Sequence, residues 1–333
     1  MRGLDLGAMR STATQNAGAF IGALLLIVLV VVGAFTIDGF WSVINLRSML
    51  LFASFLGIAA IGQTLCALVG GLDLSIPFVI GAANIGALRV MNGGVPSGVA
   101  VVSILFLAAL VGVVNGAVSY RQQGQALVVT LGVGTAVLGL VQILVSRQGT
   151  AGIAGGTIQG EVPGWLQGLV SVRSSLGVAP SVFLWAGLSV LTILLLRRTW
   201  LGRGIFALGG NRIAAKRSMM PELGIWVLVF GVSAVTAAVT GILLLGFSGG
   251  GYADVGQPYL FTTLAAVVIG GTSLVGGRGS YALTIIGALI LTVLQSILAG
   301  FSLSAAGQEA FLGAVIIPMV ALYARGQHPR MLI

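Results

Sequence analysis

The chain has 333 residues, of which 57% are hydrophobic and only 7% are charged. A water-soluble domain carries about 25% charged residues, so this chain has too few to cover a soluble surface, and lipid is indicated as its main solvent. The net charge of +9 resembles that of nucleic-acid-binding proteins. Arginines at the ends of apolar segments explain it better, so no nucleic-acid partner is predicted.

Cys66 and His328 are the single cysteine and the single histidine of the chain. One cysteine excludes a disulfide within the chain. A histidine-based catalytic triad and a His/Cys zinc site also lack their residues. No catalytic residue and no metal site is predicted, and the chain is not expected to be an enzyme.

Ten apolar segments approach or exceed the roughly 20 residues that a helix needs to cross the hydrocarbon core. They predict an all-α integral membrane protein with about ten transmembrane helices in one domain, residues 18–323, between tails 1–17 and 324–333. The third and eighth segments are short, so a count of eight or nine stays open. In chain order the segments are 18–35, 49–70, 76–91, 97–120, 126–146, 180–196, 224–247, 260–275, 281–300 and 308–323.

The basic residues predict the orientation, because short loops rich in Lys and Arg stay on the cytoplasmic side. With ten spans and the N-terminus inside, twelve basic residues fall inside and four outside, so both termini are expected in the cytoplasm. The inside set is Arg2, Arg10, Arg121, Arg197, Arg198, Arg203, Arg212, Lys216, Arg217, Arg278, Arg325 and Arg330, and the outside set is Arg47, Arg89, Arg147 and Arg173.

The connection 197–222 lies on the predicted inner side and carries six of the sixteen basic residues. Asn211 is a good N-cap, and Ala214 and Ala215 favour the short helix that would follow it. A small surface helix with a smooth alanine face suits docking into a groove of a partner. The alternative is a basic loop that only fixes the topology.

The segment 70–75, Gly-Gly-Leu-Asp-Leu-Ser, interrupts two apolar runs and places Asp73 at membrane depth or near the inner interface. An intramembrane carboxylate indicates a functional site by default. The favoured alternative is structural: Asp73 or Ser75 caps the helix that begins with Ile76 and Pro77.

Several polar side chains fall within the predicted spans. Amides and hydroxyls recognise neutral sugars, so such residues are candidates for lining a path, although they would serve equally well as hydrogen bonds between neighbouring helices. The candidates are Gln63, Asp73, Asn84, Asn115, Thr130 and Gln295.

A nucleotide-binding P-loop is excluded in this chain. The motif needs Gly-Lys followed by Ser or Thr, but the only lysine is Lys216 and Arg217 follows it. If ATP drives the protein, a separate subunit must bind it.

Five motifs occur in an order and spacing that resemble the ribose-type permease subunits of bacterial ATP-binding-cassette (ABC) importers for sugars. The match runs over about residues 49–323. The motifs are Gly70-Gly-Leu-Asp-Leu-Ser75, Gly112-Val-Val-Asn-Gly116, Val129-Thr-Leu-Gly132, Gly202-Arg-Gly-Ile-Phe-Ala-Leu-Gly-Gly-Asn211 with Ala214-Ala215, and Val268-Ile-Gly-Gly-Thr-Ser-Leu-Val-Gly-Gly-Arg278.

The resemblance implies an ABC importer permease fold in a bacterial inner membrane and a pore for a pentose- or hexose-like sugar. The implied partners are a periplasmic sugar-binding protein, a second permease chain and cytoplasmic ATPase subunits that hold ATP and Mg²⁺. This chain departs from the family pattern at Pro77 and at Ser218-Met-Met-Pro-Glu222. The residues expected to couple to the ATPase are Gly202, Arg203, Gly209, Gly210, Asn211, Ala214 and Ala215.

The alternative class is an ion-coupled secondary transporter or a channel for a small polar solute. Such proteins often carry several intramembrane charges as ion or proton relays. Here Asp73 is the strong candidate, with Glu309 at the outer edge of a span. One carboxylate is thin support for that class.

Overall fold

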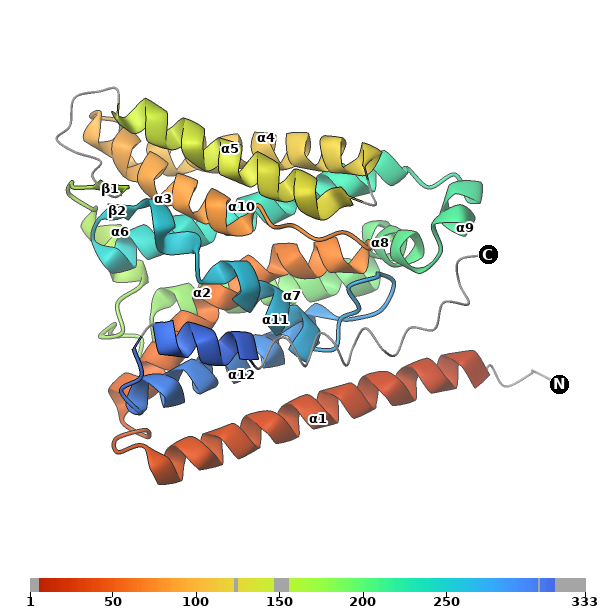
Figure 1. Ribbon diagram of the computed structural model, residues 1–333, viewed down its shortest axis with the longest axis horizontal. Coiled ribbons are helices and arrows are strands. Elements are labelled where there is room, and N and C mark those ends of the chain that lie inside the picture. Colours follow the sequence, from red (N-terminus) through yellow and green to blue (C-terminus); the bar gives the residue numbers. More distant parts are fainter. Residues whose placement is uncertain (1–5, 123–124, 147–155, 305, 315–333) are drawn as a thin grey trace.

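A computed structural model describes residues 6–122, 125–146, 156–304 and 306–314. They form an elongated bundle of helices with one two-stranded antiparallel ladder, β1 (Thr157–Ile158) and β2 (Gly251–Tyr252) (Figure 1). Residues 306–314 are also helical. The helices are α1 (Leu6–Thr36), α2 (Val43–Leu68), α3 (Ile76–Asn92), α4 (Ser97–Arg121), α5 (Ala126–Ser146), α6 (Gly164–Leu169), α7 (Pro180–Arg198), α8 (Trp200–Gly210), α9 (Arg212–Arg217), α10 (Glu222–Ser248), the 3₁₀ turn η2 (Ala253–Gly256), α11 (Tyr259–Ile269) and α12 (Tyr281–Gly300).

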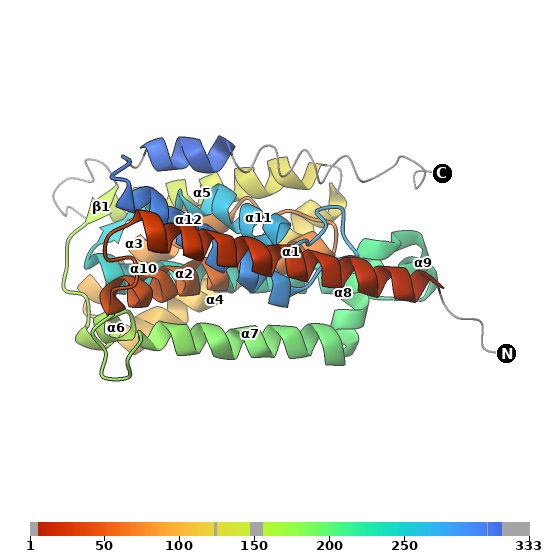
Figure 2. The ribbon, with the colours of Figure 1, turned by 90° about the horizontal axis from the view of Figure 1, so that it is seen from below.

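The bundle has two distinct ends. Helices α8 and α9 lie at one end, here called the α9 end, and β1, β2 and α6 lie at the other, here called the β end (Figures 1 and 2). Helix α1 runs along the side of the bundle, from the α9 end to the β end (Figure 2).

The all-α membrane fold predicted from the sequence is confirmed. In the described part of the chain, six helices are long and apolar enough to cross a membrane: α2, α4, α5, α7, α10 and α12. Three shorter apolar stretches, Phe20–Thr36, Ile76–Asn92 and Ala253–Ile269, fall on the predicted first, third and eighth spans. The tenth predicted span begins in the helix 306–314, and its remainder lies outside the described residues. The exact count of ten stays a prediction.

The helix that holds the first predicted span begins at Leu6, ahead of the predicted start at residue 18. The eighth predicted span is shorter in the structure. The eighth span was expected to continue to residue 275, but α11 ends at Ile269. Gly270 and Gly271 follow, and Gly271 has a φ of +77°, a conformation that cannot continue a helix. The connection 197–222 is largely helical, because α8 and α9 occupy most of it.

Helix α2 is the hub of the bundle, since its side chains from Ala53 to Leu68 are buried. Polar contacts fasten it to its neighbours, as the Tyr281 hydroxyl donates to the Gly57 carbonyl at 2.9 Å and receives a hydrogen bond from Trp185 Nε1 at 3.0 Å. The peripheral helices instead expose apolar side chains, for example Phe106 on α4, which is 63% exposed. A buried polar seam and an apolar exterior are what lipid as a solvent requires.

Helices α4 and α10 cross at very short range because glycines lie at the contact. A Cβ atom at Gly112 would lie 2.5 Å from the carbonyl oxygen of Phe230, and one at Gly116 would lie 2.8 Å from the Cα of Val227. Lipid supplies no hydrophobic force that favours one helix contact over another, so close backbone packing provides much of the association energy. The Gly112-Val-Val-Asn-Gly116 motif therefore has a packing role.

We expect Gly112→Ala to lower the apparent melting temperature of the purified protein, although alanine favours helix by about 1 kcal/mol over glycine. The added methyl group forces α4 away from α10, at a cost of about 1–3 kcal/mol. Gly132→Ala on α5 is the matched control, because a Cβ there meets nothing within 4 Å. Equal or higher stability of Gly112→Ala than of Gly132→Ala would contradict this interpretation.

Candidate functional site

The turn between α2 and α3 lies deep inside the bundle, and Asp73 is its central residue. Only 2% of Asp73 is exposed. Its partner Ser233 lies on α10, which begins at Glu222. At about 1.5 Å per residue, Ser233 is roughly 16 Å into that helix. Of the two predicted positions, membrane depth or the inner interface, this depth favours the first, and α3 then begins inside the membrane.

The Asp73 carboxylate receives four hydrogen bonds. Its Oδ1 accepts from the backbone N–H of Ser75 at 2.9 Å, from the Ser75 hydroxyl and from Asn115 Nδ2 at 3.3 Å. Its Oδ2 accepts from the Ser233 hydroxyl at 2.6 Å. Asn115 also donates to Ser75 Oγ at 3.0 Å. The carboxylate thus joins the start of α3 to α4 and α10.

The predicted capping of α3 by Asp73 or Ser75 is wrong in its detail. Ser75 occupies the N-cap position, but its side chain makes no capping hydrogen bond. The usual donor at the second helical position is missing, because Pro77 has no N–H. Asp73 instead closes a turn onto the N–H of Ser75 and ties helices together. The structural interpretation of Asp73 fits these contacts, in a different form.

Thr130 and Asn84 also make hydrogen bonds within the protein. Thr130 Oγ1 accepts from the N–H of Leu74 at 3.0 Å and so anchors the turn to α5. Asn84 donates to the Gly241 carbonyl at 3.0 Å and accepts from the N–H of Tyr252 at 2.7 Å. It therefore links α3 to α10 and to β2.

Gln63 is buried in α2, and neither of its side-chain polar atoms has a hydrogen-bond partner among the described residues. Asn115 Oδ1 is unpartnered in the same sense. Buried amides are normally satisfied, so Gln63 is the least explained polar side chain of the bundle interior, and its place on a solute path stays a prediction.

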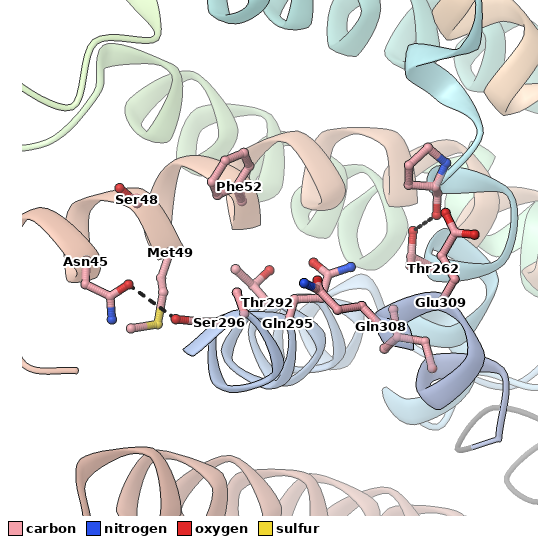
Figure 3. A pocket seen from close by; sticks show the side chains of 13 residues that line it. Asn45, Ser48, Met49, Phe52, Thr262, Thr292, Gln295, Ser296, Gln308 and Glu309 are labelled. Carbon is pink, nitrogen blue, oxygen red and sulfur yellow. Dashed lines mark hydrogen bonds between the residues drawn. The ribbon is translucent and has the colours of Figure 1, made fainter. Parts of the chain in front are cut away.

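A cavity of about 430 Å³ lies between the first part of α2, the start of α11, the last part of α12 and the helix 306–314 (Figure 3). Of the six path candidates, Gln295 lines it. Glu309, noted above at the outer edge of a span, also lines it. Most other lining residues were not among the path candidates, although those on α2 and α12 follow a helical spacing of i, i+3, i+4 and i+7 that could have revealed them. On α2 they are Asn45, Ser48, Met49 and Phe52; on α12 they are Thr292, Gln295, Ser296 and Ala299; the remainder are Pro258, Thr262, Gln308, Glu309 and Leu312.

At the α9 end, α9 is a short helix with a well-formed N-terminus. Asn211 Oδ1 accepts from the N–H of Ala214 at 3.0 Å, which confirms the predicted cap. Ahead of it, Gly209 packs so closely that a Cβ atom would overlap the Leu68 carbonyl oxygen. The N–H of Gly277 donates to the same Leu68 oxygen at 2.9 Å. The ends of α2 and α8 therefore meet the loop 270–280 through backbone contacts.

The seven predicted coupling residues divide into two groups. Arg203, Gly210, Asn211 and Ala214 are exposed, whereas Gly202 and Ala215 are buried and Gly209 is half-buried. The alanine pair does not form one outward face, because Ala215 packs inward against a cluster of buried apolar residues that includes Leu208 and Ile225. The outward face instead has Ile213, 69% exposed, and Met219, 86% exposed.

Arg212 fastens α9 to two long helices, a role that the sequence did not reveal. Its Nε lies 3.0 Å from Glu222 Oε2, at the start of α10. Its guanidinium lies 5.1 Å from the ring centroid of Tyr120, at the end of α4, and 5.8 Å from that of Trp226. The Tyr120 hydroxyl also contacts Glu222 Oε2 at 3.4 Å. Such stacking adds about 0.5–2 kcal/mol to an ion pair.

The Asp73 contacts predict that Asp73→Asn keeps stability and transport close to wild type. An asparagine oxygen still accepts from Ser75, and its amide can donate to Ser233 Oγ. Asp73→Ala leaves these buried donors unpaired and should cost about 3 kcal/mol or more. Thermal melting and solute uptake are measured for both variants. If Asp73 relays protons, Asp73→Asn will abolish transport while the protein stays folded.

Comparisons with known proteins agree with this architecture. Residues 45–320 match the family described as "Branched-chain amino acid transport system / permease component". The ribose import permease protein RbsC of Escherichia coli (strain K12) is 31% identical over 271 residues, which cover 81% of this chain and 83% of that protein.

Two further relatives cover similar lengths. The probable ABC transporter permease protein YphD of Escherichia coli (strain K12) is 32% identical over 301 residues, 90% of this chain and 88% of that protein. The autoinducer 2 import system permease protein LsrD of Yersinia enterocolitica is 28% identical over 267 residues, 80% of this chain and 79% of that protein. The chain therefore belongs to this permease family, and it is the membrane-embedded permease subunit of an ABC importer.

Proposed function

We propose that this permease forms the path for a small sugar that a periplasmic binding protein delivers. Relatives named for the import of ribose and of autoinducer 2 support a sugar-like cargo. A second permease chain and two cytoplasmic ATPase subunits complete the importer. ATP and Mg²⁺ bind to the ATPase subunits, in keeping with the missing P-loop, and this chain needs no cofactor of its own.

The α9 end faces the cytoplasm in this proposal, and the protein lies in a bacterial inner membrane. The basic residues support this orientation, because they favour the cytoplasmic side. At the α9 end, Arg121 is the last residue of α4, and Arg197 and Arg198 are the last residues of α7. Arg47 and Arg173 lie at the β end. Both termini are then cytoplasmic. The tails are residues 1–17 and 324–333, and the membrane domain between them is residues 18–323. The β end, with Trp165 and residues 252–259, receives the binding protein.

Helix α9 couples the ATPase to the membrane helices, and the observation that carries this assignment is its pair of contrasting faces. Outward, Ile213 and Ala214 are exposed beside the basic side chains of Lys216 and Arg217. Inward, Arg212 binds the start of α10 and the end of α4. A partner that moves α9 must therefore move these helices as well.

The force has a direct route to the membrane interior. Helix α10 carries both Glu222, which holds Arg212, and Ser233, which holds Asp73. Gly209 offers a parallel route, since it abuts the end of α2 and the loop 270–280. Rigid helices with backbone contacts transmit displacement with little loss, because packed interfaces are not continuously deformable.

Reconstitution tests the proposed function. In proteoliposomes, D-ribose uptake should require the ATPase subunits, ATP and the binding protein, and should continue without a proton or sodium gradient. Ala214→Trp should abolish uptake and lower the amount of co-purified ATPase at least ten-fold, because the bulky ring occupies the docking face. The thermal stability of the variant should stay unchanged.

The matched control is Ser175→Trp, an equally bulky change at an exposed residue of the opposite end. It should leave ATPase co-purification at the wild-type level. Normal ATPase binding and uptake with Ala214→Trp would remove α9 from the coupling site. Uptake that runs on an ion gradient without ATP would overturn the importer mechanism.

Arg212→Gln should separate ATP hydrolysis from transport. The variant keeps the exposed face of α9, so the ATPase subunits still bind, but the helix loses its ion pair and its stacking on Tyr120. We expect several-fold less sugar imported per ATP hydrolysed, with Arg212→Lys in between because lysine keeps the charge but not the planar contacts. An unchanged ratio of uptake to hydrolysis in Arg212→Gln would show that Arg212 only stabilises the fold.

A further inference from the structure

The cavity of about 430 Å³ lies in the half of the bundle nearer the β end. Its lining residues on α2, from Asn45 to Phe52, belong to the first part of that helix, and those on α12, from Thr292 to Ala299, belong to the last part. In the proposed orientation this is the outer half of the membrane, on the side of the delivering protein. Its volume falls in the range of small-molecule sites, about 300–1,000 Å³.

The polar groups of the cavity are mostly acceptors. The hydroxyls of Ser48, Thr262 and Thr292 donate to backbone carbonyls of their own helices, so their lone pairs face outward. The side chains of Gln295 and Glu309 make no hydrogen bond to any described residue. A solute with many hydroxyl donors matches this set.

The formal charge that lines the cavity is negative. Glu309 is the single charged residue among the described residues that line it, and no lysine or arginine is among them. A solute with a carboxylate or phosphate group would meet a like charge and no cationic partner. A sugar phosphate or a sugar acid is therefore disfavoured.

One wall of the cavity is apolar. The Phe52 ring of α2 lies across from Thr292 and Gln295 of α12 (Figure 3), and Met49 extends the same wall. An apolar wall opposite amides and a carboxylate suits a ring that has C–H groups on one face and hydroxyls at its edge.

We propose that this cavity is a binding site for a neutral polyhydroxylated solute in transit and that Glu309 makes it select against anions. This inference rests on the proposed sugar import and deepens it. Gln295 and Glu309 hold the hydroxyls, and Phe52 packs against the ring.

Cysteine labelling tests the site without measuring transport. Cys66, the single cysteine of the chain, is buried, so Ser296→Cys adds a reporter in the cavity over a low background. Two methanethiosulfonate probes are compared at low ionic strength, one carrying trimethylammonium and one carrying sulfonate. The cationic probe should react faster, and Glu309→Gln should lower that preference by about ten-fold, because removal of a nearby unit charge affects the two probes in opposite directions.

Protection identifies the ligand class. Excess D-ribose should slow labelling of Ser296→Cys several-fold, ribose 5-phosphate should not, and Gln295→Ala should remove the protection. Ser175→Cys, on the exposed loop before α7, is the control reporter and should respond to neither sugar nor to Glu309→Gln. If Ser296→Cys does not fold, Ala299→Cys at the exposed rim replaces it.

Two results would overturn the inference. Equal protection by ribose 5-phosphate would show that Glu309 does not select by charge, and absent protection while the importer still takes up D-ribose would show that the solute passes elsewhere. Uptake by the wild-type importer reports the sugar function separately. A failure of uptake with an intact probe preference would therefore count against the cargo and not against the charge of the cavity.

Discussion

The structure depends on one constraint: an irregular turn inside a membrane must have its polar groups satisfied by other parts of the protein. Asp73 meets this need for the turn that precedes α3. It binds Ser75 at the start of the helix and Ser233 on α10, while Asn115 approaches from α4. Water is absent from the hydrocarbon core, so these donors replace it. An irregular turn can therefore persist at this depth.

The same helix α10 that holds Asp73 also meets α9 through Glu222 and Arg212. The close α4–α10 crossing at Gly112 and Gly116 keeps these contacts in register. The proposed coupling route therefore runs through one rigid helix and its glycine-lined neighbour, and it joins an ion pair at the surface to close backbone packing inside the bundle.

Polar side chains in the bundle serve two purposes, which their hydrogen bonds distinguish. The side chains of Asn84 and Thr130 form hydrogen bonds with backbone groups of neighbouring segments. Gln295 and Glu309, in contrast, face a cavity. A residue whose partners are all within the protein holds the fold, and a residue with free groups at a cavity is available to a solute.

Much followed from the sequence alone. Composition decided the solvent, and the length of the apolar segments located the long spans. The Asn211 cap and the permease family were readable from local motifs, because each depends on residues close together in the sequence. The cavity, the Arg212 cluster and the partners of Asp73 depend on side chains from distant segments meeting in space. Gln63, Asn84 and Gln295 look alike in sequence, and only the tertiary structure separates them. The position of a residue in a helix determines the face on which its side chain lies, but only the packing of the helices determines what lies opposite that face.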